Sequence, residues 1–124
     1  MKIGSILENQ KNEKRISITP DVIKKYISLG CEIVLSKNYG LHLGINDKEY
    51  SDEGAKLIDD DNEILKNSDL ILQLGILSDE KSSLLKENQT LVGVLNPYDN
   101  KEKLETLLKK KINLFSLELL PRIT

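Results

Sequence analysis

Residues 19–35 read TPDVIKKYISLGCEIVL, and this stretch decides the fold class. Its first three residues supply an N-cap, a proline at the first helical position and an acidic first turn. The apolar residues that follow recur at three- and four-residue spacing up to Leu29, and Gly30 stands where a glycine commonly ends a helix. The pattern predicts a helix over 20–29.

An apolar run lies on each side of this helix. Residues 2–7 (KIGSIL) open the chain, and residues 31–35 (CEIVL) follow the helix directly. Both runs are long enough for a strand and too short for a helix. Strand, helix and strand in this order have the length that a parallel crossover requires, so the three together predict a parallel sheet.

Strand and helix patterns continue to alternate along the chain. Further short strands are predicted at 55–58, 70–74, 90–95 and 112–117. Further helices are predicted at 47–51, 62–67, 78–85 and 100–111, the last with Leu104, Leu107 and Leu108 facing inward. Strands that are apolar on both faces indicate a three-layer α/β domain with a mostly parallel sheet, a flavodoxin- or Rossmann-like lobe that takes up residues 1–124.

Composition excludes several classes of function. The chain has 18 Lys and Arg against 20 Asp and Glu, and the two signs are interspersed, so no basic face for nucleic acid is expected. No apolar run approaches the roughly 20 residues that cross a bilayer, and no secretory signal opens the chain. We expect a soluble, cytoplasmic piece.

No metal site is expected either. The single cysteine and the single histidine, Cys31 and His42, have no partner at metal-ligand spacing. The run Asp59–Asp61 is more typical of a solvated helix start than of a metal site.

Ligands of open parallel sheets gather at the carboxyl ends of the strands, so the residues that follow each predicted strand are the candidates. No Gly-x-Gly-x-x-Gly and no phosphate-binding P-loop follows any of them, and this lobe alone is not expected to bind a dinucleotide. Arg15 and Arg122 are the only arginines, and a guanidinium is suited to a carboxylate, a phosphate or a carboxamide oxygen. The tyrosines Tyr39, Tyr50 and Tyr98 are expected at the edges of the core.

Two motifs resemble a known family. Residues 12–20 (NEKRISITP) are similar to the N-terminal signature Asn-Glu-x-Arg-Val-Ala-x-Thr-Pro of alanine dehydrogenases and the alpha subunit of NAD(P) transhydrogenase. The ending at 118–124 (ELLPRIT) resembles the transhydrogenase form Pro-Arg-Ile-Ser/Thr, which continues there into a long helix. A less specific likeness lies at 68–74 (SDLILQL). The resemblance covers the whole chain and implies an N-terminal lobe cut off before a Rossmann NAD-binding lobe.

The resemblance also separates two activities. In alanine dehydrogenases the residue matching Arg15 binds the carboxylate of pyruvate, a lysine matches Gln73 and a histidine matches Asn96. A neutral amide at Gln73 supplies no cation, and Asn96 cannot exchange a proton as an imidazole does. Oxidative deamination is therefore disfavoured.

Transhydrogenases need no such groups, because hydride passes directly between two nicotinamide rings that the protein aligns. In that family the arginine matching Arg122 lies beside the NAD(H) nicotinamide, so Arg122 is the expected cofactor-binding residue. Arg15, Gln73 and Asn96 are cleft candidates, and no residue is expected to be catalytic.

The resemblance further implies NAD(H) between this lobe and the next, and NADP(H) on a separate domain. It implies membrane subunits that couple hydride transfer to proton passage, a homodimer in the intact protein, and a cytoplasmic position peripheral to the inner membrane. This piece alone is expected to be inactive and to bind no cofactor. Two alternatives stay open: an alanine dehydrogenase-like amino-acid dehydrogenase, and a non-catalytic flavodoxin-like binding module.

Overall fold

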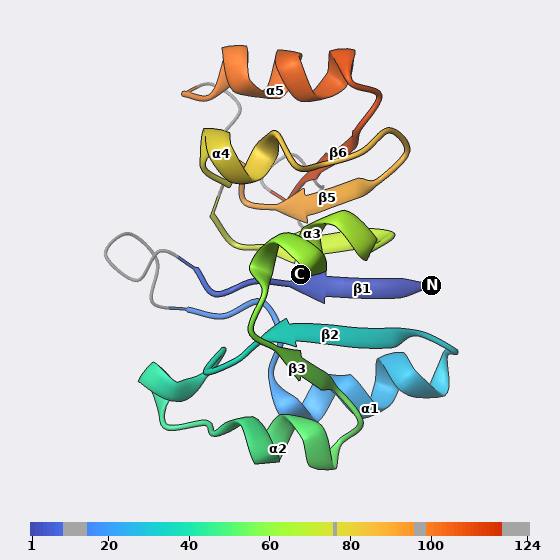
Figure 1. The fold of residues 1–124 in the computed structure, drawn as a ribbon, viewed down its shortest axis with the longest axis vertical. Helices are drawn as coiled ribbons and strands as arrows, with labels where there is room; N and C mark the ends of the chain where they lie inside the picture. The colour runs from blue at the N-terminus through green and yellow to red at the C-terminus, as the bar shows by residue number, and fades with distance from the viewer. Residues whose placement is uncertain (9–14, 76, 96–98, 118–124) are drawn as a thin grey trace, which may run out of the picture.

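The computed structural model describes residues 1–8, 15–75, 77–95 and 99–117. In these ranges six strands form one sheet in the order β3-β2-β1-β4-β5-β6, and every neighbouring pair is parallel (Figure 1). The strands are β1 (Lys2–Ser5), β2 (Glu32–Ser36), β3 (Lys56–Ile58), β4 (Leu70–Gln73), β5 (Thr90–Gly93) and β6 (Asn113–Ser116). The predicted α/β class and parallel sheet are confirmed.

The strands are joined through helices that lie close to the predicted ranges. They are α1 (Pro20–Ser28), the 3-10 helix η1 (Leu41–Leu43), α2 (Asp47–Asp52), α3 (Asp61–Asn67), α4 (Asp79–Ser82) and α5 (Lys101–Lys109). Asp60 caps α3 and Ser78 caps α4 through their side chains, as such residues do at a helix start. The prediction for α4 was too long, because the N–H groups of Leu84 and Leu85 bond three residues back and tighten the chain into a turn.

Helix α1 begins where its sequence predicts. Thr19 is the N-cap and Pro20 the first helical residue, although the Thr19 side chain makes no capping bond. Proline with its fixed φ, followed by the acidic Asp21, therefore marks this start. Gly30 has φ +88, the left-handed conformation that ends a helix at little cost for glycine.

Helices pack on both faces of the sheet, which gives the three predicted layers. Alternate residues of β2 show this directly: Ile33 and Leu35 join the apolar cluster of α1 and α2, whereas Val34 joins the cluster of α3 and α5. Such a central parallel strand is buried on both faces and is apolar throughout for that reason.

One prediction about the C-terminal third was wrong. Leu108 does not face inward but is 57% exposed, because α5 lies at the end of the sheet and buries only the row of Leu104 and Leu107 (Figure 1). Strand β6 is the last strand of the sheet, and its Phe115 is 54% exposed. An edge strand has a neighbour on one side only, so part of its apolar surface meets solvent.

Candidate functional site

The strand order places a topological switch point between β1 and β4. The chain passes from β1 outward to β2 and β3 on one side, then returns to β4 and continues outward on the other (Figure 1). In open α/β sheets the crevice for a ligand lies at the carboxyl ends of the two strands beside this point. The site is therefore sought where β1 ends at Ser5 and β4 ends at Gln73.

Gln73 is buried at this point and binds the neighbouring strand. Its Oε1 accepts from the N–H of Ile6 at 2.7 Å, and its Nε2 donates to the carbonyl oxygen of Ile6 at 3.2 Å. The side chain is 2% exposed. A buried amide with both ends engaged holds β1 against β4 beyond their last ladder bonds, and it faces the interior rather than a ligand.

Glu8 fills the position next to Gln73 from the β1 side. Its carboxylate accepts from the N–H of Leu74 at 2.5 Å and from the N–H of Gly75 at 3.3 Å, and the residue is 7% exposed. Two successive main-chain N–H groups at a strand end are a common cradle for an anion. Here the chain's own carboxylate occupies that cradle.

Ser36 closes the same edge of the sheet on the β2 side. Its hydroxyl accepts from the N–H of Leu7 at 2.9 Å and donates to Oδ1 of Asp61 at 2.6 Å. One side chain thus connects the end of β1, the end of β2 and the first residue of α3.

A buried hydroxyl chain lies beneath the segment that carries Arg15. Ser5 Oγ donates its single proton toward the carbonyl oxygen of Leu72 at 2.6 Å, so Tyr39 is the donor in the 2.8 Å contact between the Tyr39 hydroxyl and Ser5 Oγ. The Tyr39 hydroxyl in turn accepts from the N–H of Ser17 at 3.2 Å. Burial raises the pKa of Tyr39, with the Ser5 hydrogen bond acting in the opposite direction.

The structure brings two of the four predicted site residues to this edge. Gln73 ends β4, and Arg15 is exposed two residues before Ser17, which the hydroxyl chain joins to the end of β1. The other two, Asn96 and Arg122, lie outside the described residues, so their predicted roles stay predictions.

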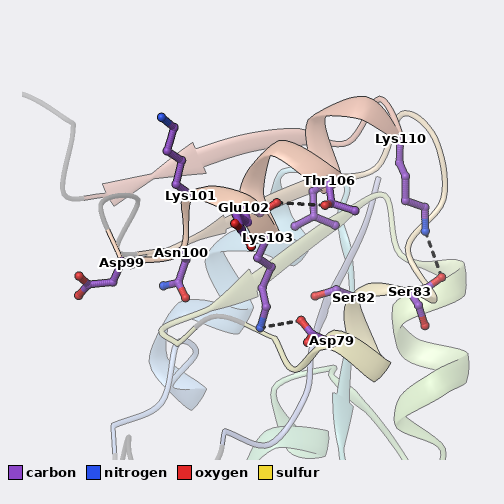
Figure 2. Close-up of a pocket in the computed structure, with 11 residues that line it drawn as sticks. Asp79, Ser82, Ser83, Asp99, Asn100, Lys101, Glu102, Lys103, Thr106 and Lys110 are labelled. Atoms are coloured by element: carbon purple, nitrogen blue, oxygen red, sulfur yellow. Dashed lines mark hydrogen bonds and ion pairs between the residues drawn. The ribbon is translucent and has the colours of Figure 1, made fainter.

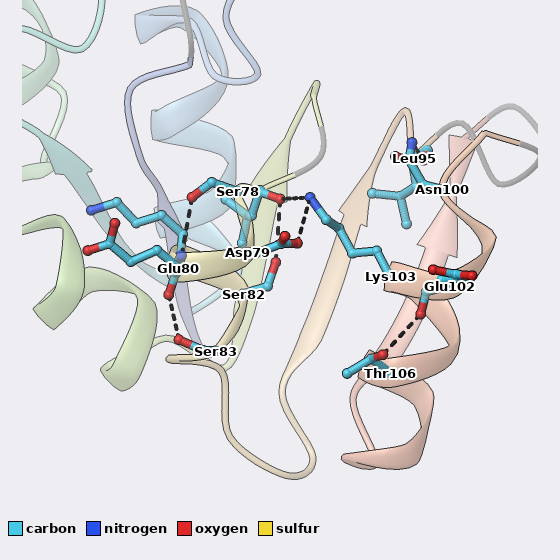
Figure 3. Close-up of polar contacts among 12 residues, drawn as sticks. Ser78, Asp79, Glu80, Ser82, Ser83, Leu95, Asn100, Glu102, Lys103 and Thr106 are labelled. Atoms are coloured by element: carbon cyan, nitrogen blue, oxygen red, sulfur yellow. Dashed lines mark hydrogen bonds and ion pairs between the residues drawn. The ribbon is translucent and has the colours of Figure 1, made fainter.

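A separate groove of about 800 Å³ lies between α4 and α5 (Figure 2). Lys103 bridges it, with Nζ 2.9 Å from the carbonyl oxygen of Leu77 and 3.2 Å from Oδ1 of Asp79, and Lys110 donates to the carbonyl oxygen of Ser83 at 3.1 Å. Other polar contacts around it lie within a helix, such as Thr106 Oγ1 donating to the carbonyl oxygen of Glu102, or join α5 to the preceding loop, as Asn100 Nδ2 does by donating to the carbonyl oxygen of Leu95 (Figure 3).

Three acidic and three basic side chains line this groove, namely Asp79, Asp99, Glu102, Lys101, Lys103 and Lys110. The balance of charge favours neither an anion nor a cation. The groove also lies away from the switch point, so we assign it no part in the site.

Two other kinds of site were sought in the described ranges. There, no three His, Cys, Asp or Glu side chains are grouped so that they could hold a metal ion. Of the helices in that same part of the chain, none has the length and hydrophobicity that a membrane crossing needs.

Comparison with known proteins supplies the family. The family model described as "Alanine dehydrogenase/PNT, N-terminal domain" matches residues 4–124. The chain belongs to this family.

Relatives of this alanine dehydrogenase/PNT N-terminal domain include transhydrogenase subunits. The chain is 37% identical over 128 aligned positions to the first part of NAD(P) transhydrogenase subunit alpha from Rickettsia prowazekii, covering 100% of this chain and 33% of that protein. It is 30% identical over 129 positions to the protein of the same name from Rhodospirillum rubrum, covering 100% and 34%. The chain thus spans about a third of the length of these relatives.

A solved structure agrees with this assignment. The fold matches "The crystal structure of transhydrogenase from Sinorhizobium meliloti" with a TM-score of 0.91 and 28% identity, over 100% of this chain and 37% of that one. The resemblance to the alanine dehydrogenase and transhydrogenase family that the two sequence motifs indicated is therefore confirmed.

In the part of this edge that the structure describes, the main-chain N–H groups after β4 are not available to a dinucleotide. A pyrophosphate binds there to main-chain N–H groups of a glycine-rich turn. In this domain the N–H groups of Leu74 and Gly75 are taken by Glu8, whose negative charge repels a phosphate. At these two N–H groups the described residues do not fit a pyrophosphate.

Sequence reasoning counted Glu8 among the residues that follow the first strand but gave it no role, and it did not place Tyr39 in this site. Glu8 was visible only as one polar residue after the first strand, and its partners are 66 and 67 residues away. Tyr39 and Tyr50 were expected at the edges of the core, yet both are fully buried inside it with their hydroxyls bonded. A polar residue directly after a strand and a tyrosine directly before a glycine were the available signals. Tyr98 lies outside the described residues.

Proposed function

We propose that this domain is the N-terminal lobe of an NAD(P) transhydrogenase alpha subunit and forms one wall of its NAD(H) cleft. The similarity to transhydrogenase alpha subunits over the whole chain carries the proposal. The likeness to a transhydrogenase structure over the whole chain supports it. The bound NAD(H) supplies the hydride, and this lobe supplies alignment.

The switch point favours a wall over a nucleotide pocket. Gln73 is turned into the sheet and Glu8 fills the anion cradle, so the crevice of this lobe is closed by its own side chains. A dinucleotide would then be held by the Rossmann lobe that we propose to follow, and it would meet only the outer surface of the edge described here.

The same edge disfavours an amino-acid dehydrogenase. Binding of a carboxylate substrate calls for converging cations, and Gln73 brings an uncharged amide that is already engaged with Ile6. Direct hydride transfer requires no such group, because its demand is the relative placement of two rings.

Residue roles follow as proposals. Arg122 contacts the nicotinamide carboxamide, Arg15 stands at the cleft edge, and Asn96 lines the cleft without exchanging a proton. NADP(H) belongs to a partner domain, membrane subunits couple the transfer to proton passage, and the intact protein is a homodimer on the cytoplasmic side of the inner membrane. This lobe alone is inactive.

The test is an assay of both activities on the full-length protein combined with the partner domain that we propose to bind NADP(H). Transfer of hydride from NADPH to an NAD⁺ analogue with a distinguishable absorbance, without pyruvate-dependent NADH oxidation in the presence of ammonia, supports the proposal. Pyruvate reduction without transfer between nucleotides supports the alanine dehydrogenase alternative. A gene product that ends near Thr124 and has neither activity supports a binding module.

A further inference from the structure

We infer that Tyr39 and Tyr50 are positioning residues that hold the segment carrying Arg15 at the cleft edge. The inference rests on the proposed function, because it assigns Arg15 to that cleft. Both tyrosines belong to the connection from β2 through α2, far from Arg15 in sequence.

The two tyrosine hydroxyls form hydrogen bonds to adjacent residues of that segment, one as an acceptor and the other as a donor. The Tyr39 hydroxyl accepts from the N–H of Ser17 at 3.2 Å, and the Tyr50 hydroxyl donates to the carbonyl oxygen of Ile18 at 2.9 Å. These main-chain groups follow Arg15 by two and three residues. Because one tyrosine hydroxyl binds a main-chain donor and the other binds a main-chain acceptor, the two hydrogen bonds together fix both the position and the rotation of this backbone.

The pair is rigid. Both side chains are fully buried, and their rings meet edge to face with centroids 5.7 Å apart and planes at 82°. A Cβ atom on Gly40 would lie 2.9 Å from the Tyr50 hydroxyl, so a glycine is needed there for that hydroxyl to reach its place. The Tyr39 hydroxyl is also hydrogen-bonded to Ser5 at the end of β1, so Tyr39 links the sheet to this segment.

Within the described part of the chain, the side chains of Ser17 and Ile18 form no hydrogen bonds that would do this in place of the tyrosines. The Ser17 hydroxyl is buried and forms no hydrogen bond to any residue that the structure describes. Ile18 is fully buried, which fixes its depth but leaves the direction of its peptide groups to polar contacts. The two tyrosine hydroxyls supply those contacts, two and three residues after Arg15.

The test is a double-mutant cycle on NADH affinity in the full-length protein. Tyr39→Phe and Tyr50→Phe remove one hydroxyl each, and we expect each to raise the Kd for NADH about five- to tenfold by loosening Arg15. In an Arg15→Ala background the same substitutions should have less than about a twofold effect, since there is no longer a guanidinium to place. Tyr26→Phe, the same change in α1, is the matched control and should leave the Kd unchanged.

Amide hydrogen exchange of Ser17 supplies an independent readout. Tyr39→Phe should accelerate it about tenfold or more, whereas Tyr26→Phe should not. Equal loss of affinity in both backgrounds, or unchanged exchange at Ser17, would overturn the inference. An Arg15→Ala protein with unchanged affinity would overturn the assignment of Arg15. If the full-length protein does not bind NADH at all, the proposed function fails, and the exchange rates still decide whether the tyrosines hold the segment.

Discussion

The side-chain amide of Gln73 binds both main-chain groups of Ile6: its Oε1 lies 2.7 Å from the Ile6 nitrogen, and its Nε2 lies 3.2 Å from the Ile6 carbonyl oxygen. The contact crosses the switch point of the sheet, where a ligand crevice opens in related architectures. With Glu8 bound to the N–H groups just beyond it, the ends of β1 and β4 form one closed unit. The consequences of this closure can be measured.

Replacing Gln73 should destabilise the domain more than a substitution of an exposed residue does. Gln73→Ala leaves the N–H and carbonyl of Ile6 buried without these partners, so we expect a loss of about 2–4 kcal/mol in the free energy of unfolding. Asn67→Ala, which removes an exposed amide at the end of α3, should cost less than about 0.5 kcal/mol. Urea denaturation of the variants measures both, and equal effects would show that the Gln73 contacts contribute little.

Removing Glu8 should expose an anion site. In Glu8→Ala the N–H groups of Leu74 and Gly75 lose their carboxylate, and a small carboxylate such as acetate can take its place. We expect acetate to shift the amide NMR signals of these two residues in the variant but not in the unmodified protein, and to restore some of the lost stability. Chloride at the same ionic strength controls for screening. Equal shifts in both proteins would show that Glu8 does not fill this cradle.

The buried tyrosines should make the domain sensitive to alkali. Burial raises the pKa of Tyr50, with smaller contributions from Tyr39, Glu49 and Asp47, and burial likewise raises that of Tyr39. The unfolded chain ionises its tyrosines near pH 10 while the folded one still keeps these two protonated. Stability is therefore fully present below about pH 10 and falls as the pH rises through the higher folded-state values.

The Tyr39→Phe/Tyr50→Phe variant should lose stability less steeply between about pH 10 and 12 than the unmodified chain does. The lysines titrate in both proteins, so only the difference between the two slopes reports on the tyrosines. Urea denaturation across this range measures it, and identical slopes would contradict the expected pKa values.

Local patterns in the sequence were enough to predict the fold class and most elements. Helix α1 followed from its proline start and glycine end, because these signals act within a few residues. The exposure of Leu108 and of Phe115 could not be predicted in the same way. Both exposures arise because α5 and β6 lie at the end of the sheet. Local periodicity does not predict the order of the strands.

The candidate site was predictable only in outline. The rule that ligand sites follow strand ends selected Arg15 and Gln73, and the structure places both at one edge of the sheet, although their roles there stay predictions. That Gln73 turns inward, and that Glu8 reaches Leu74, depends on pairing between strands more than sixty residues apart. A single sequence carries no direct signal for such pairs.

Calorimetric titration of NADH shows whether this lobe forms a cleft wall or a binding site of its own. The titration compares residues 1–124, a chain extended through the Rossmann lobe that we propose to follow, and the Arg122→Ala variant of that longer chain. We expect that only the longer chain binds NADH and that Arg122→Ala weakens its binding. Tight binding of NADH by residues 1–124 alone would contradict it, because Glu8 and Gln73 would then not close the switch point.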